Sequence, residues 1–335
     1  MSSLSAMFFR LCSLLFFSIS ASTQANICSL VEDGSMVDEA SVFAADDSSD
    51  SFDDANSAFS EKACDMYNNA YLLIEPYLET EDVAIYDDDL RYINAFPFSA
   101  YELISVPSQG FFYINVINDT IKNQLRNKKC WEPQNKAIIE KFVKPGSIVL
   151  DIGAHIGTHT VTMAKCVGEN GMVLAFEPSK NIHRELSYNL VANECYNAYP
   201  IRAAIGKTKS IIDVVISHPH NEGGSYVVDT RGGSNTAVQL PLDALNLNNI
   251  SFIKIDVENM EADVLDGAEL TILRNRPVIM IEIQGNGERP IQLGENTKEM
   301  ARISIEKIRK LGYSLIAIRN SADYLAFPEE LGLKL

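Results

Sequence analysis

The most informative side chains of this 335-residue chain are acids that follow short apolar runs. Asp151 comes directly after one such run, and Gly153 and Gly157 follow it before a helical pattern begins. Glycines let a ligand approach the backbone, and the start of a helix supplies free N–H groups, so the segment predicts a nucleotide-type cradle. Glu177 ends the next apolar run, where one carboxylate can accept hydrogen bonds from both hydroxyls of a ribose.

The cradle lacks the complete Gly-x-Gly-x-x-Gly fingerprint of pyrophosphate sites, which disfavours a dinucleotide and favours a nucleoside without phosphates. The alternative is an ordinary strand–turn–helix corner whose glycines only allow close packing. The position of Glu177 at the end of the second run favours the nucleoside site.

A second pair of acids stands at the end of the apolar run 251–255. Ligands of open α/β sheets bind outside the carboxyl ends of the strands. Asp256 or Glu258 is therefore a candidate general base for an acceptor hydroxyl, or a group that orients it. The alternative is that Asp256 caps the helix starting near Glu258. The residues favour neither interpretation, and both can hold together.

His155 and His159 are four residues apart and could share one face of a helix. Two imidazoles do not make a metal site without a third ligand, and the sequence has no Cys-x-x-Cys pair. We therefore predict no metal, and polar packing of both histidines near the cofactor.

Apolar runs and helical patterns alternate from residue 147 onward, which predicts a parallel sheet. Strands are expected at 147–151, 172–177, 199–204, 251–256 and 278–283, with one of the helices running from Met260 to Ile272. Two last short runs, 314–318 and 324–327, are too close for a crossover helix and must pair as a hairpin. The prediction is a doubly wound α/β fold: a mostly parallel seven-stranded sheet with an antiparallel edge strand and helices on both faces. Residues 210–240 are expected to be an irregular insertion able to form a hairpin.

Charge is unevenly distributed along the chain, whose net charge is −17. Residues 1–100 hold 18 acids and 3 bases, whereas the remainder holds 27 acids and 25 bases. Neither part has a basic stripe, so we expect no nucleic-acid partner.

The N-terminal part predicts three segments. Residues 1–25 resemble a signal peptide or N-terminal anchor, because an apolar run at 7–20 follows a thin basic region. Residues 26–62 are rich in acids, serine and alanine, and are expected to be a disordered linker. Residues 63–125 are expected to be an accessory segment or lid.

Three motifs together resemble the FkbM family of S-adenosylmethionine-dependent methyltransferases. They are Ile148-Val-Leu-Asp-Ile-Gly-Ala-His-Ile-Gly-Thr-His-Thr-Val161, then Val173-Leu-Ala-Phe-Glu-Pro178 with the run to Asn193, and Phe252-Ile-Lys-Ile-Asp-Val-Glu258 with Glu261 and Arg276-Pro-Val-Ile-Met-Ile-Glu282. Trp131-Glu132-Pro133 also resembles an upstream segment of the family. The resemblance covers about 115–318 and departs from the family at His155, which usually is Asn, and at Asn259, which usually is Gly. It implies an FkbM-like methyltransferase domain at 126–335.

The resemblance implies the cofactor S-adenosyl-L-methionine and a set of residues around it. Those that would cradle the methionine part are Asp151, Gly153, His155 and Gly157; those at the ribose and adenine are Glu177, Pro178, Ala203 and Ala204. The implied reaction is methyl transfer, usually to a hydroxyl, and we expect a saccharide or similar small-molecule acceptor. The alternatives are a nucleotide-cofactor-dependent oxidoreductase and a catalytically silent exported binding protein.

The expected location is in tension with the expected cofactor. The leader-like segment predicts export, or membrane attachment through residues 7–20, whereas S-adenosylmethionine is a cytosolic metabolite. Export or attachment is the prediction, with a cytoplasmic protein as the alternative.

Overall fold

The computed structural model describes residues 49–79, 82–117, 119–218, 221–228, 235–284, 295–319 and 321–332. They lie almost entirely within the compact unit Asp53–Leu335. The predicted signal segment, and the predicted linker up to residue 48, lie outside the described residues. Within the described part, no helix is both long and apolar enough to cross a membrane.

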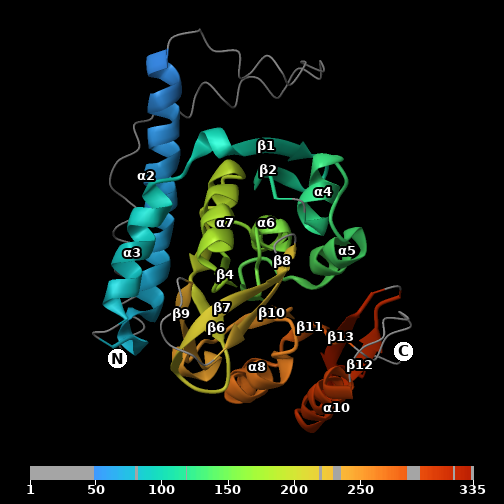
Figure 1. Cartoon of the computed structure of the whole chain (residues 1–335). Coiled ribbons are helices and arrows are strands. Elements are labelled where there is room, and N and C mark those ends of the chain that lie inside the picture. Colours follow the sequence, from blue (N-terminus) through green and yellow to red (C-terminus); the bar gives the residue numbers. More distant parts are fainter. Residues whose placement is uncertain are drawn as a thin grey trace. The chain divides into compact units, whose positions relative to one another are not determined.

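Seven strands form the main sheet in the order β12-β13-β11-β10-β3-β4-β5. Figure 1 labels five of them, β12, β13, β11, β10 and β4. Their bounds are β3 (Ile148–Ile152), β4 (Met172–Phe176), β5 (Ala198–Ile201), β10 (Ile250–Ile255), β11 (Val278–Glu282), β12 (Tyr313–Ala317) and β13 (Asp323–Pro328). The first five are parallel to one another, and β13 is antiparallel to both β11 and β12. The predicted fold class is confirmed. The hairpin adds one detail, because β13 lies one place in from the edge and β12 is outermost.

Helices cover both faces of this sheet because its strands are buried on both sides. Val149, Val173 and Phe252 join a core with the helices α5 (Pro133–Phe142), α6 (Thr158–Val167) and α7 (Lys180–Ala192). The alternate residues Leu150 and Leu174 join a second core with α8 (Glu261–Gly267), α9 (Glu269–Asn275) and α10 (Glu295–Lys310). The burial pattern therefore places the carboxyl ends of the strands between two packed layers.

Two predicted elements are divided in the structure. The helix expected from Met260 to Ile272 is broken at Ala268 into α8 and α9. The strand expected at 199–204 ends its pairing with β4 at Ile201, and β6 (Ala203–Ile205) pairs with β9 (Thr236–Leu240) instead. Periodicity does not show the first break, because the helical spacing of apolar residues continues through it. At the second break the only interruption in the sequence is Arg202.

Residues 210–240, expected to be irregular, mostly belong to a second sheet with the order β6-β9-β7-β8. Its other members are β7 (Ser210–His218) and β8 (Asn221–Val228). The glycines 223 and 224, expected in a turn, lie within β8. Strand pairing overrode the turn preference of these residues.

The N-terminal part of the described chain forms a helical layer and a hairpin. Its elements are α2 (Ser49–Ile74), α3 (Val83–Asn94), β1 (Tyr101–Val106), β2 (Gly110–Asn115) and α4 (Thr120–Arg126). Helix α2 begins inside the predicted linker 26–62, so that prediction is wrong for residues 49–62. Its buried residues recur at helical spacing, namely Ser60, Ala63, Met66, Tyr67, Ala70 and Ile74. The acids that suggested disorder occupy other positions of this amphipathic helix.

Candidate functional site

A cavity of about 220 Å³ lies at the carboxyl ends of β3, β4, β10 and β11. Eight of the ten predicted site residues line it: Gly153, His155, Glu177, Pro178, Ala203, Ala204, Asp256 and Glu258. Asp151 and Gly157 are near it in the chain but do not line it. The fold thus brings together acids from four separate parts of the sequence, at residues 132, 177, 256–258 and 282, at the edge where α/β proteins bind ligands.

Glu177 follows β4 and is almost fully buried. Its Oε2 accepts a hydrogen bond from the backbone N–H of His155 at 3.0 Å, and its Oε1 accepts one from the N–H of Ser179 at 2.9 Å. Burial raises the pKa of Glu177 to about 7, although both N–H groups oppose the shift. Each carboxyl oxygen keeps a second lone pair, so the group can also accept hydrogen bonds from a ligand in the cavity.

The turn after β3 depends on glycine at two positions. Gly153 has φ +81°, and a Cβ there would lie 1.8 Å from the backbone oxygen of Asp256. Gly157 has φ +91°, and a Cβ would lie 2.7 Å from Leu186 Cδ1 in α7. The turn therefore touches the end of β10 on one side and α7 on the other. This close packing explains why both positions need glycine, and it requires no contact between Gly157 and a ligand.

His155 occupies the middle of this turn in a left-handed conformation, with φ +50°. Both ring nitrogens are buried, and neither has a hydrogen-bond partner. Burial lowers the pKa of His155 to about 3, and Lys122 lowers it further, so the ring is neutral. The side chain lines the cavity with one unused donor and one unused acceptor.

Asp151 belongs to the floor of the site and not to its lining. Its Oδ2 accepts a hydrogen bond from Thr160 at 2.7 Å, and its Oδ1 lies 3.4 Å from the ammonium of Lys254. The predicted direct contact of Asp151 with the cofactor therefore does not follow from this geometry. Asp151 instead helps to hold a buried cation.

Lys254 is the residue that the sequence reasoning missed. It points inward from β10, and its Nζ lies 3.1 Å from Asp256 and donates to the backbone oxygen of Gly153 at 3.0 Å. Burial opposes its charge, but Asp256 and Asp151 raise the pKa of Lys254. A lysine within an otherwise apolar strand is the signal that could have found it, because an ammonium is rarely buried without partners.

Asp256 and Glu282 form a carboxyl pair at the ends of neighbouring strands. Burial raises the pKa of Glu282 to about 10, and the charge of Asp256 adds to this, so Glu282 is protonated. Burial also acts on Asp256, but Lys254 and a hydrogen bond from Glu282 hold the pKa of Asp256 below its ordinary value. The pair thus presents one carboxylate, with 36% of the Asp256 side chain accessible, beside one carboxylic acid.

Glu258 follows in a left-handed conformation, with φ +49°, and accepts a hydrogen bond from Gln284 at 3.0 Å. Burial and then the charge of Asp256 raise the pKa of Glu258 to about 7. The backbone N–H of Asn259 donates to Glu261 at 3.0 Å, whereas no side-chain bond from Asp256 caps α8. Helix capping therefore does not account for Asp256.

The remaining wall comes from residues before the predicted cradle, including Trp131 and Glu132. Gln109 holds this wall, accepting from the Trp131 N–H at 2.8 Å and donating to the Trp131 oxygen at 3.3 Å. Glu132 Oε2 lies 3.1 Å from His159 Nε2 and accepts from Asn135 at 2.9 Å. His155 and His159 therefore have different surroundings: His159 is paired with Glu132, whereas His155 faces the cavity.

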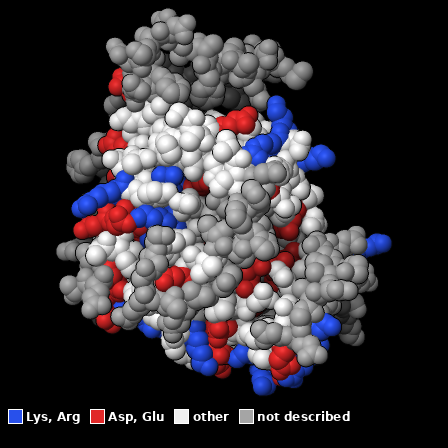
Figure 2. Space-filling view, in the orientation of Figure 1, with Lys and Arg blue, Asp and Glu red and all other residues white. Residues whose placement is uncertain are grey.

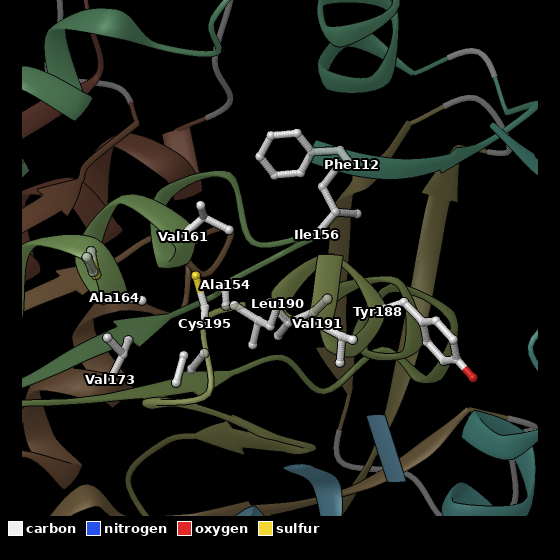
Figure 3. Close-up of a cluster of buried hydrophobic side chains, with 14 of the residues drawn as sticks. Phe112, Ala154, Ile156, Val161, Ala164, Val173, Tyr188, Leu190, Val191 and Cys195 are labelled. Atoms are coloured by element: carbon white, nitrogen blue, oxygen red, sulfur yellow. The ribbon is translucent and has the colours of Figure 1, made fainter. Parts of the chain in front are cut away.

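Buried apolar and amide side chains fix the turn from below. Figure 3 shows Ile156 of the turn close to Phe112 of β2, within the cluster that α6 and α7 also join. Asn189 of α7 donates to the Ile156 oxygen at 2.8 Å and accepts from the Tyr113 N–H at 2.6 Å. Asn189, a residue of the family motif, therefore positions the site without touching a ligand.

Residues 151–315 match the family described as methyltransferase FkbM domain. This stretch of the chain is an FkbM methyltransferase domain. The FkbM domain begins in β3 and ends in β12, so it contains every predicted site residue. The match makes the chain an S-adenosylmethionine-dependent methyltransferase and removes the support for the oxidoreductase alternative.

Similar solved structures are distant from this FkbM-domain chain. A methyltransferase FkbM from Methylobacillus flagellatus is 14% identical with a TM-score of 0.38, over 57% of this chain and 50% of that one. An rRNA-methylase, described as putative, from Clostridium thermocellum is 15% identical with a TM-score of 0.39, over 58% and 92%. An O-methyltransferase from Bacillus cereus in complex with SAH is 16% identical with a TM-score of 0.39, over 58% and 80%. No curated protein matches the sequence.

The cavity fits the cofactor that the FkbM domain requires. Glu177 offers free acceptor capacity, and the adjacent wall of small and apolar residues suits an adenine: Ile182, Ala203, Ala204 and Ile205. The unpartnered ring of His155 can bond the polar end of a ligand. Within the described residues, no group of three or more His, Cys, Asp or Glu is arranged to hold a metal ion.

Proposed function

We propose that the protein transfers a methyl group from S-adenosylmethionine to a hydroxyl of a saccharide or similar hydroxylated small molecule. The observation that carries the proposal is the Asp256 carboxylate, which lines the cavity and is kept ionised by Lys254. A hydroxyl is a poor nucleophile until a base takes its proton or a carboxylate orients it. Asp256 is the described group best placed for either task.

The cofactor would be held by residues from three strand ends. Glu177 accepts from the ribose hydroxyls, Ala203 and Ala204 flank the adenine, and the turn at Gly153 and His155 contacts the methionine part. When bound, S-adenosylmethionine supplies a methyl group on a positively charged sulfur, which is a good leaving group.

The protein's own contribution is to position the acceptor and to receive a proton. The reaction forms an oxygen–carbon bond, breaks the sulfur–carbon bond and releases the hydroxyl proton. Lys254 and the hydrogen bond from Glu282 keep Asp256 ionised but make it a weak base, so Asp256 first orients the hydroxyl. Asp256 takes the proton as the new oxygen–carbon bond makes the oxygen strongly acidic. Lys254 is a positioning residue, since its ammonium contacts Asp256 and the turn but does not line the cavity.

The test is methyl transfer from tritium-labelled S-adenosylmethionine to a panel of saccharides, with Asp256→Asn beside the unaltered protein. We expect the variant to bind S-adenosylhomocysteine normally and to lose methyl transfer by about a hundredfold or more. Asp263→Asn is the matched control, because Asp263 lies in the first turn of α8 and does not line the cavity. Equal turnover of the unaltered protein and Asp256→Asn would remove Asp256 from the reaction.

A further inference from the structure

The cavity combines a concentration of acids with a lack of basic side chains. Five carboxyl groups line it, namely Glu132, Glu177, Asp256, Glu258 and Glu282, and no Lys or Arg occurs among the described residues of the lining. Outside it the charges are mixed, as Figure 2 shows on one face, where basic and acidic side chains of the described chain are interspersed. The described lining of the cavity therefore differs from the surface around it in having no basic side chain.

The nearby cation does not neutralise this excess toward a ligand. Lys254 is 5% exposed, and its contacts are with Asp151, Asp256 and the Gly153 oxygen. The imidazole of His155 is neutral, since burial lowers its pKa to about 3. A ligand entering the cavity therefore meets carboxyl groups without a competing positive charge.

Three of these carboxyl groups are held partly or wholly protonated by their surroundings, and Glu177 is one of them, with a pKa raised to about 7. Burial and then Asp256 raise the pKa of Glu258 to about 7, and the same causes raise that of Glu282 to about 10. Like charges in a buried site disfavour one another, and a cation placed among them relieves this repulsion. An anionic ligand would increase it.

An independent observation shows that a polar ligand belongs in the cavity. Both nitrogens of His155 are buried and unpartnered, which is costly unless something bonds them. A neutral imidazole has one donor and one acceptor, so one nitrogen can bond the methionine part of the cofactor while the other remains for a hydroxyl of the acceptor. Trp131 lines the same cavity and offers a π-face, which attracts cations and packs against sugar rings.

We propose that the acceptor is a hydroxylated amine, such as an amino sugar, whose ammonium is recognised by Glu258 while Asp256 serves the hydroxyl. This inference rests on the proposed function, and it narrows the acceptor from saccharides in general to cationic ones. It excludes sugar acids and phosphorylated sugars as preferred acceptors.

The test compares sugars that differ in charge at one position. Binding of glucosamine, N-acetylglucosamine, glucose and glucuronate is measured by calorimetry on the full chain saturated with S-adenosylhomocysteine, so that no turnover occurs. We expect glucosamine to bind about tenfold more tightly than the two neutral sugars, and glucuronate to bind least. Equal affinities, or no measurable binding of glucosamine, would overturn the proposal.

Variants then locate the charge recognition. Glu258→Gln is expected to reduce the preference for glucosamine at least about threefold, and Glu258→Ala provides a second variant should the first fail to fold. Glu169→Gln is the matched control, since Glu169 is exposed in the turn before β4 and does not line the cavity. If Glu258→Gln instead weakens S-adenosylmethionine relative to S-adenosylhomocysteine and leaves the sugar preference unchanged, the acids serve the sulfonium alone and the proposal is wrong.

Methyl transfer to the same sugars separates this proposal from the one on which it rests. If glucosamine binds preferentially but no saccharide hydroxyl is methylated, the recognition of positive charge stands and O-methylation of saccharides is refuted. Transfer to neutral sugars without a preference for the amine keeps O-methylation and refutes the cationic acceptor.

Discussion

Whether an acid of this site can bind a ligand depends on the hydrogen bonds and ion pairs that its carboxyl group already makes. Glu177 accepts from two backbone N–H groups, so it both shapes the turn and faces the cavity. Asp151 looks equivalent in the sequence, because it too is an acid at a strand end. In the structure Thr160 and Lys254 take its oxygens. The residue pattern could predict where acids gather, but not which of them retains free acceptor capacity.

The first prediction concerns the ribose contact. Glu177→Gln removes the charge-assisted hydrogen bonds to two ribose hydroxyls, each worth roughly 1.5–3 kcal/mol. Affinity for S-adenosylhomocysteine should therefore fall at least about tenfold in calorimetry, with the circular dichroism spectrum unchanged. Glu169→Gln is the control, because Glu169 is exposed. Glu185→Gln would not serve, because Glu185 is in a buried ion pair with Lys122. Unchanged affinity of Glu177→Gln would refute the ribose assignment.

A second prediction follows from three acids whose pKa is raised to about 7, namely Glu177, Glu258 and Glu261. An acid whose pKa is higher in the folded than in the unfolded chain binds more protons when the chain is folded. Its protonation therefore stabilises the fold below about pH 5, and this contribution is lost as the pH rises through about 7. The free energy of unfolding contributed by these groups should thus fall between about pH 5 and pH 8. Denaturant titrations at both ends of this interval measure the sum of this fall, of the further fall caused by the raised pKa of Glu282, and of the opposite contribution of the neutral His155 and His183 below about pH 6.5.

The variant Glu258→Gln tests which groups produce this slope. It removes one titrating carboxyl, so the loss of stability over the same interval should shrink by roughly 1–3 kcal/mol. Glu169→Gln should leave the slope unchanged. An identical slope in Glu258→Gln and the unaltered protein would contradict the raised pKa of Glu258.

At the scale of elements, the site depends on how closely neighbouring segments approach. The turn after β3 contacts the end of β10 through Gly153, and the break between α8 and α9 follows Gly267, whose Cβ would lie 1.9 Å from the Gly206 oxygen. Apolar runs predicted the strands of the main sheet to within one residue, except at the end of β5, which stops at Ile201 where 204 was expected. They could not predict that β5 ends and β6 begins around Arg202, because that break follows from tertiary contacts. Arg202 is buried there in an ion pair with Asp89 of α3.

The third prediction tests this close approach. Gly153→Ala places a Cβ against the backbone of Asp256 and also strains a residue with φ +81°. We expect it to lower the free energy of unfolding by more than about 3 kcal/mol, beyond the roughly 1 kcal/mol that positive φ alone costs an alanine. Gly332→Ala is the control, since Gly332 is left-handed, with φ +59° and ψ +22°, but has nothing within 4 Å of the added Cβ. Equal destabilisation of the two variants would show that β10 can move aside.

At the scale of the whole described chain, the N-terminal helices are part of the methyltransferase core. Phe59 of α2 lies edge-on to Tyr113 of β2, with ring centroids 6.3 Å apart. The hydroxyl of Tyr188 in α7 donates to Ser60 at 2.7 Å and can also donate to the Ile93 oxygen at 3.1 Å. Composition favoured a disordered linker here, because acids and serines dominate the average while the few buried positions carry the packing. A boundary set by composition therefore came too late in the chain.

The last prediction follows from this packing. Removing residues 49–62 deletes the first half of α2, so Tyr188 loses the Ser60 hydroxyl and the aromatic cluster around Phe96 and Tyr113 loses Phe59. Losses of this kind lower the free energy of unfolding by a few kcal/mol. Since 1 kcal/mol shifts the melting temperature of a large domain by about 2–4 °C, we expect the melting temperature to fall by about 5 °C or more. Differential scanning fluorimetry measures it, with Glu61→Ala as the control because Glu61 is exposed on the same helix. An unchanged melting temperature would mean that α2 is dispensable and that the core begins after residue 62, whereas a fall confined to the deletion makes this helix a structural part of the enzyme.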